Sequence, residues 1–174
     1  MMIETERLNI RPMQQSDSPA LLRLSMDFEH SPLANYDSPF PLDPAANQRL
    51  TEFLASTGLF FAVCRKDTAE MIGFVCFHRN GDTFDLGYRF LTAHHGHGFA
   101  FEACTAMMEH IRQQFRPSAF TAGTALDNAP SCRLLARLGF RLQHTEVVSF
   151  RKTAASEPIA FTGGIFIKTL PQEV

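Results

Sequence analysis

The segment LTAHHGHGFAFEACTAMMEHI, residues 91–111, joins the end of a strand, two glycines and the start of a helix. Apolar side chains at helical spacing predict a helix from about Gly98 to Phe115. Gly96 and Gly98 stand directly at its start. A strand that runs through G-x-G into a helix exposes unpaired backbone N–H groups at the positive end of the helix dipole. The segment therefore predicts an anion site that suits a pyrophosphate.

Two familiar phosphate-binding loops do not fit these glycines. No Lys-Ser or Lys-Thr pair follows them, which excludes a Walker A loop. The dinucleotide-binding pattern needs a third glycine where Phe101 stands, and it needs parallel strands. The preceding sequence instead predicts an antiparallel meander of strands at 59–66, 71–79 and 83–91, with Asn80-Gly81 as a hairpin turn. The pattern therefore points away from NAD and ATP.

The sequence before the meander predicts a strand, two helices and a proline-rich loop. Residues 3–12 alternate and form the strand, and a helix follows with Ser16 or Asp17 as its N-cap. Residues 31–44 contain four prolines and are expected to form the loop or a broken helix. Asp43 precedes Pro44 and caps a second helix that ends near residue 56. The residues expected to face inward on that helix are Leu50, Phe53 and Leu54.

The sequence after the long helix predicts a strand, a helix and a final pair of strands. The strand spans 118–126, and the helix has Asn128 as N-cap and Gly139 at the left-handed position after its end. Two strands then flank a loop at 154–158. The element order predicts an α+β fold, with a twisted, mostly antiparallel sheet of about seven strands flanked by about four helices. We expect residues 1–174 to form a single domain.

The composition is that of a globular protein with a substantial core. Hydrophobic residues make up 45% of the 174 residues and charged residues 20%. The net charge of -2 predicts no direct binding to nucleic acid or to an anionic membrane surface. No apolar run is long enough to cross a bilayer, and the acidic N-terminal segment does not fit a signal peptide. The four cysteines are widely spaced, which favours a reducing cytoplasmic location.

Three motifs together resemble the GNAT acyltransferase superfamily. They are TERLNIRPM (5–13), GYRFLTAHHGHGFAFEA (87–103) and NAPSCRLLARLGF (128–140). They are most similar to the branch that includes the ribosomal-protein N-terminal acetyltransferases. Two positions depart from that branch: Ala93 replaces the frequent Gln or Arg, and Arg89 replaces a frequent Trp. Pyrophosphate binding by backbone amides tolerates both changes, whereas the change to Arg89 bears on acceptor preference.

The resemblance implies acetyl transfer from acetyl-CoA to a primary amine. It implies that the pyrophosphate lies on the amides of the glycine loop and that the pantetheine arm pairs like an extra strand with the backbone at residues 90–92. Asn128 would contact the pantetheine or simply cap its helix, and two arginines of that helix would pair with the 3′-phosphate. The implied CoA-binding residues are Phe90, Leu91, Thr92, His95, Gly96, His97, Gly98, Phe99, Ala100, Asn128, Ser131, Arg133 and Arg137.

Two residues are candidates for catalysis. Asp85 stands where this branch often carries an acid and would remove a proton from the amine, directly or through water. Strand alternation places Asp85 on the same face as Gly87 and Arg89. His78, on the neighbouring strand, is an alternative base, because histidine changes charge near neutral pH. Ser131 would donate to the sulfur of the leaving thiolate.

The histidines around the glycines do not predict a metal site. His94, His95 and His97 are too close in a glycine loop to converge on one ion, and no carboxylate or cysteine completes a ligand set. We therefore expect no metal. These side chains would instead line the phosphate site.

The sequence leaves two acceptors open, a protein N-terminus and a small-molecule amine. It also leaves open whether the protein is a monomer or a homodimer. The acceptor is expected to approach between the first helices, the loop at 31–44 and the last hairpin. Acidic residues there would attract a cation: Asp27, Glu29, Asp37 and Asp43. One alternative is a non-catalytic domain that binds or senses acyl-CoA, and another is an interaction module without a CoA site.

Overall fold

The computed structural model describes residues 2–171. Its four α-helices are α1 (Ser18–Glu29), α2 (Pro44–Ser56), α3 (Phe99–Phe115) and α4 (Ala129–Arg137). Short 3-10 turns are η1 (Gln15–Asp17), η2 (Ala34–Tyr36) and η3 (Thr92–His94). The strands are β1 (Ile3–Glu4), β2 (Leu8–Pro12), β3 (Phe60–Arg65), β4 (Met71–Asn80), β5 (Thr83–Phe90), β6 (Ala119–Ala125), β7 (Arg141–Lys152) and β8 (Pro158–Thr169).

All eight strands form one sheet in the order β1-β2-β3-β4-β5-β6-β8-β7. Every neighbouring pair is antiparallel except β5 and β6, which are parallel. The predicted α+β class with a mostly antiparallel sheet and four helices is confirmed. The strand predicted at 3–12 divides in two, because the N–H of Thr5 donates to the carbonyl of Leu8 and turns the chain back on itself. That turn adds the eighth strand.

Helices cover both faces of the sheet. One core cluster joins α3 and α4 to the sheet through residues such as Met107, Leu135 and Phe77. The other joins α1 and α2 to the opposite face through residues such as Leu24 and Leu54. Successive side chains of a strand point to opposite faces, so β5 divides its residues between these two cores.

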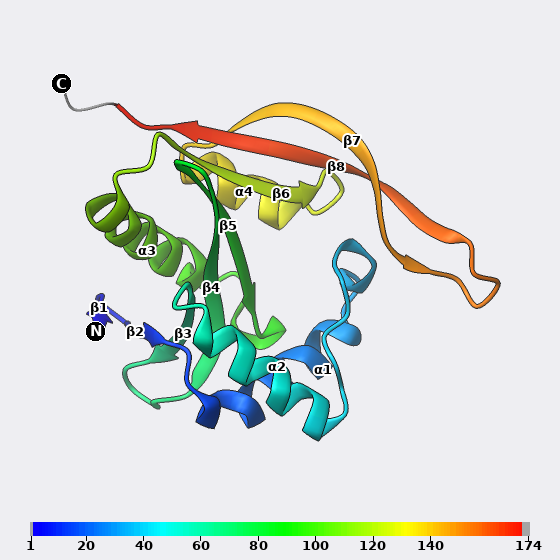
Figure 1. Cartoon of the computed structure of the whole chain (residues 1–174), viewed down its shortest axis with the longest axis horizontal. Coiled ribbons are helices and arrows are strands. Elements are labelled where there is room, and N and C mark those ends of the chain that lie inside the picture. The colour runs from blue at the N-terminus through cyan, green and yellow to red at the C-terminus, as the bar shows by residue number, and fades with distance from the viewer. Residues whose placement is uncertain (1, 172–174) are drawn as a thin grey trace.

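The sheet opens between β5 and β6. These strands pair over three residues only, Thr83–Asp85 with Ala119–Thr121. Beyond that point β5 continues beside β4, whereas β6 continues beside β8, and Figure 1 shows the two strands diverging from their meeting point. The last two strands extend away from the body as a long hairpin (Figure 1). The edge of β5 from Leu86 to Phe90 therefore faces a gap in the hydrogen-bonded sheet.

Local chemistry explains the helix ends. The carboxylate of Asp43 accepts from the N–H of Ala46 at 2.8 Å, and the side chain of Asn128 accepts from the N–H of Ser131 at 3.3 Å. Gly139 has φ 89°, the left-handed conformation expected after α4. The three capping predictions are confirmed.

Two local predictions are wrong. The hairpin turn after β4 is Gly81-Asp82, because Asn80 still pairs with Thr83 in the ladder. Phe53 of α2 is 63% exposed and does not face the core. The buried positions of α2 include Asn47 and Thr51, and the hydroxyl of Thr51 donates to the carbonyl of Asn47 within the helix. A polar residue can occupy the inward face when its hydrogen bond is made inside the helix.

Within residues 2–171, no helix combines the length and the apolar character that crossing a bilayer requires.

Candidate active site

The glycine loop presents a row of unpaired backbone N–H groups. Gly96 and Gly98 have φ values of 77° and 81°, a left-handed conformation that favours glycine. Within residues 2–171, the N–H groups of Gly96, His97 and Gly98 make no hydrogen bond. The first N–H groups of α3 lack partners by helix geometry. Together they form a cradle of donors at the positive end of a 17-residue helix.

The N-terminal segment holds this cradle in place. Glu102, in the first turn of α3, accepts from the Thr5 hydroxyl at 2.6 Å and from the backbone N–H of Arg7 at 2.8 Å. The Arg7 guanidinium donates to the other Glu102 oxygen and to the carbonyl of His97. Burial opposes the charged form of Glu102, but these hydrogen bonds outweigh it and lower the pKa of the carboxyl. Glu102 is therefore structural, and it joins the TERL motif to the glycine-loop motif.

The three histidines of the loop contact three different partners. His94 lies 3.7 Å from a Glu70 carboxylate oxygen, Nε2 of His95 lies 2.9 Å from the carbonyl oxygen of Phe90, and His97 stacks on Phe99. No set of three or more metal-ligating side chains gathers among the described residues.

The backbone at the end of β5 is partly occupied. The N–H of Leu91 donates to the carbonyl of Ile72 at 2.9 Å, and the N–H of Thr92 donates to a carboxylate oxygen of Asp27 at 2.8 Å. Alternation along a ladder then turns the N–H groups of Tyr88 and Phe90 toward the open side. The free donors on the edge of β5 therefore come before residue 91.

Asp85 lies at the closed end of the opening. Its carboxylate accepts from the Thr121 hydroxyl of β6 at 2.8 Å. The alternative base, His78, is opposite Asp85 in the β4–β5 register and is exposed. Gly87 lies next to Cys76 of the α1/α2 core, since a Cβ at Gly87 would approach its sulfur to 2.8 Å. Asp85 thus belongs to the α1/α2 face of β5.

Ser131 belongs to the opposite face. Its hydroxyl lies 2.6 Å from the hydroxyl of Tyr88, which packs against the α3/α4 core. Burial raises the pKa of Tyr88 well above its usual range, so the phenol stays protonated. Sequence reasoning proposed Ser131 as a site residue but did not predict its contact with Tyr88. The G-Y dipeptide of the second motif was the available signal.

The α4 arginines lie on the outer side of this face. The guanidinium of Arg137 lies 4.1 Å from the centre of the Phe101 ring, in the first turn of α3. Both residues line a cavity of about 340 Å³ that also includes Lys168. Arg133 is exposed. Arg137 therefore lies beside the first turn of α3.

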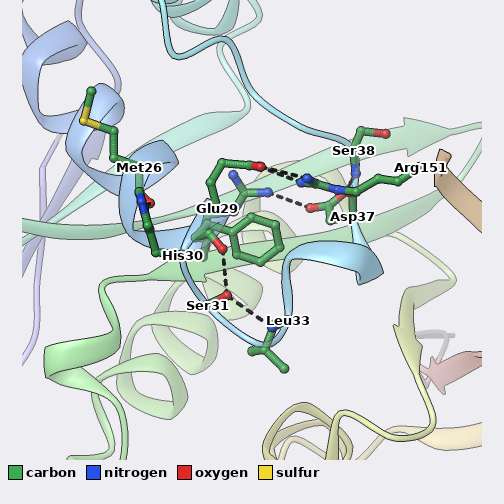
Figure 2. Close-up of polar contacts among 10 residues, drawn as sticks. Met26, Glu29, His30, Ser31, Leu33, Asp37, Ser38 and Arg151 are labelled. Atoms are coloured by element: carbon green, nitrogen blue, oxygen red, sulfur yellow. Dashed lines mark hydrogen bonds and ion pairs between the residues drawn. The ribbon is translucent and has the colours of Figure 1, made fainter. Parts of the chain in front are cut away.

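Arg89 is buried on the α1/α2 face, 7% exposed, between two aromatic rings. Its guanidinium lies 4.0 Å from the centre of Phe28 and 4.4 Å from that of Phe40. Nη2 donates to the Asp37 carboxylate, and burial lowers the pKa of Arg89. Figure 2 shows Arg151 from β7 reaching the same region, where it donates to Glu29 at 2.6 and 2.7 Å and to the carbonyl of Asp37.

The acidic residues near the expected acceptor path all have partners within the protein. Glu29 pairs with Arg151 and Asp37 with Arg89. Asp27 accepts from Thr92, and Asp43 caps α2. Arginines therefore neutralise Glu29 and Asp37, whereas the partners of Asp27 and Asp43 are neutral donors, so the expected attraction of a cation stays a prediction.

Known proteins share this sequence pattern and fold. A family model described as an acetyltransferase (GNAT) domain matches residues 7–141. The Bacillus subtilis (strain 168) protein named uncharacterized N-acetyltransferase YoaA is 25% identical over 145 residues, which cover 80% of this chain and 82% of that protein.

Two solved structures share the fold. The ribosomal-protein-S5-alanine acetyltransferase from Vibrio fischeri has a TM-score of 0.79 and 20% identity, covering 97% of this chain and 96% of that one. RimL, a ribosomal L7/L12 alpha-N-protein acetyltransferase solved with coenzyme A, has a TM-score of 0.80 and 16% identity, covering 98% of both chains. The family match and the relatives give one identification: this chain belongs to the GNAT acetyltransferase family and is an N-acetyltransferase.

Proposed function

We propose that the protein moves an acetyl group from acetyl-CoA directly to a primary amine. The observation that carries this proposal is the cradle of unpaired N–H groups from Gly96 to Ala100, which opens beside the divergence of β5 and β6. A diphosphate there would meet backbone donors and a helix dipole without needing a lysine. The open edge of β5 then continues from the cradle toward Asp85.

The CoA arm would follow that edge. The N–H groups of Tyr88 and Phe90 face the opening and would pair with the pantetheine amides as a strand would. Asn128 lies at the start of α4 and would contact the same arm while it caps the helix. Arg137, and with it the exposed Arg133, would meet the 3′-phosphate.

The two faces of β5 would divide the chemistry. Asp85 on the α1/α2 face would take a proton from the incoming ammonium, directly or through water. The nitrogen electron pair then forms a bond to the thioester carbon, and the C–S bond breaks with its electrons on sulfur. The second N–H proton of the attacking amine passes to that thiolate, directly or through water, so the products are the amide and the thiol of CoA. Ser131 on the α3/α4 face would donate a hydrogen bond to that thiolate. The amine and the leaving group thus remain on opposite sides of the thioester.

The acceptor would approach over the wall formed by Asp37, Arg89 and Arg151. Because the acids of this wall are paired internally, shape and aromatic contacts would select the amine more than charge attraction. The Vibrio fischeri protein is named for alanine of a ribosomal protein, so peptides with N-terminal alanine belong in an acceptor panel beside small amines.

The test has two stages. Saturating acetyl-CoA should raise the thermal midpoint of the protein, and thiol release should depend on at least one amine of the panel. Stabilisation without thiol release from any amine would favour the non-catalytic acyl-CoA-binding alternative. No stabilisation would favour an interaction module without a CoA site.

A further inference from the structure

The hydrogen bond between Tyr88 and Ser131 connects the two sides of the opening. Tyr88 comes from β5, and Ser131 comes from the first turn of α4, which follows β6. Their oxygens are 2.6 Å apart, a short distance for two neutral hydroxyls. Within residues 2–171, the Tyr88 hydroxyl has no other hydrogen-bond partner.

The direction of this bond follows from the acidity of the two groups. A phenol is a stronger acid than an aliphatic alcohol, so it is the better donor, and the serine oxygen is the better acceptor. When Tyr88 donates, the single proton of Ser131 is released from this pair and can point elsewhere. Without the phenol, that proton could rotate among several acceptors.

Serine is suited to hydrogen bonding rather than to proton transfer. Its hydroxyl is a much weaker acid than the thiol of CoA, so it keeps its proton when the thiolate forms. Its contribution is a hydrogen bond to the negative sulfur. Donation from a second hydroxyl polarises the first, which strengthens that bond in a site with low dielectric constant.

We propose that Tyr88 is a positioning residue for the leaving group, which donates to Ser131 Oγ and directs the Ser131 proton to the sulfur of CoA. This role rests on the proposed function, because that function places the sulfur near Ser131. The Tyr88 ring packs against the α3/α4 core, and this packing restricts the position of its hydroxyl.

The first experiment measures the pKa of the thiol in bound CoA and needs no amine. The thiolate absorbance of the CoA complex is titrated in the parent, Tyr88→Phe, Ser131→Ala and the double variant. We expect Tyr88→Phe to raise the bound thiol pKa by about half a unit to one unit. Ser131→Ala should raise it at least as much, and the double variant should match Ser131→Ala. The N-cap survives in Ser131→Ala, because it uses the backbone N–H.

The second experiment measures turnover with the best amine. Tyr88→Phe should lower kcat about tenfold and leave the KM for acetyl-CoA within about twofold. In the double variant, kcat should equal that of Ser131→Ala, because Tyr88 acts through that hydroxyl. Thr51→Val is the matched control: it removes a buried hydroxyl hydrogen bond that is made within α2, and it should leave kcat unchanged.

The outcomes separate the two proposals. A bound thiol pKa that is the same in the parent and in Tyr88→Phe overturns the Tyr88 role, and so do effects that multiply in the double variant. A thiol pKa that responds to Tyr88, with no amine acetylated, supports the Tyr88 role and overturns the transferase proposal. Failure of the parent to bind CoA overturns both.

Discussion

Oδ2 of Asp37 lies 2.8 Å from Nη2 of Arg89, so an exposed carboxylate compensates a buried guanidinium. Arg89 occupies the position after G-Y where the related branch often has Trp. The two residue types share a flat group, and here the flat guanidinium fills the slot between Phe28 and Phe40. Replacing Trp by Arg89 therefore adds a charge to the wall formed by Asp37, Arg89 and Arg151, while a planar group still lies between the two rings. It also ties the η2 loop to β5.

Removing Asp37 should destabilise the protein more than removing both partners. Asp37→Ala leaves a buried charge unpaired, and because Asp37 itself is largely exposed we expect a cost of about 1–2 kcal/mol in the free energy of unfolding. Arg89→Met in the Asp37→Ala background should recover part of that cost. Urea denaturation measures both. Equal stability of the parent and Asp37→Ala would show that Arg89 needs no counterion.

The Glu29–Arg151 pair should make stability depend on pH in the acid range. The Arg151 hydrogen bonds lower the pKa of Glu29 below its ordinary value of 4.5. The stabilisation is therefore complete above about pH 4.5 and disappears as the pH falls through the folded pKa. At pH 7, Glu29→Gln should cost about 1–2 kcal/mol, and the difference from the parent should shrink below pH 4.5.

Glu109→Gln is the matched control for that experiment. Hydrogen bonds from Arg112 and Gln113 lower the pKa of Glu109 to about 2, yet its side chain is 48% exposed. Solvent screens exposed pairs, so the cost should stay below about 0.5 kcal/mol. A larger loss from Glu109→Gln than from Glu29→Gln would contradict the importance that we give to burial.

A negative charge in the glycine loop should oppose CoA binding. Asp and Asn both tolerate the left-handed conformation of Gly96, and no atom lies within 4 Å of an added Cβ there. Gly96→Asp should weaken acetyl-CoA binding at least about tenfold relative to Gly96→Asn, because only Asp repels the pyrophosphate. Isothermal titration gives both affinities.

Gly81→Asp controls for backbone strain in that comparison. Gly81 also has a left-handed conformation and open space around an added Cβ, but it lies in the β4–β5 turn. We expect unchanged acetyl-CoA affinity. Equal binding by Gly96→Asp and Gly96→Asn would place the pyrophosphate elsewhere.

The identity of the base can be decided between Asp85 and His78. Asp85→Asn keeps an acceptor for the Thr121 hydroxyl but removes the basic oxygen, so kcat should fall about 100-fold or more. His78→Gln should change kcat less than about threefold, since His78 is exposed at the strand end. Loss of the acidic limb of the pH–rate profile in His78→Gln, with Asp85→Asn active, would reverse the assignment.

Local signals predicted the elements well because their causes are local. Asn128 and Gly139 fix the ends of α4 through backbone geometry within a few residues. The prediction for Phe53 was wrong because hydrophobicity alone assigned the face of α2. Asn47 and Thr51 are buried because their side chains make hydrogen bonds, which a prediction from hydrophobicity does not take into account.

The contacts that assemble the site are long-range and could not be predicted from spacing. Glu29 and Arg151 are separated by 122 positions, and Thr5 and Glu102 by 97. A single sequence shows that each residue is charged or polar, but not which partner neutralises it. The motifs indicated which segments carry the candidate site, while only the structure shows that Glu29 and Asp37 are already paired with arginines.

The short seam between β5 and β6 has a mechanical consequence. Three residue pairs join the strands that carry most of the N-terminal half to the three-stranded C-terminal portion of the sheet. A molecule hydrogen-bonded to both β5 and β6 beyond these three pairs would bridge the two parts of the sheet. Binding of such a molecule would restrict the motion of the two parts of the sheet relative to each other. Amide exchange along Leu86–Phe90 should therefore slow when the substrate is present.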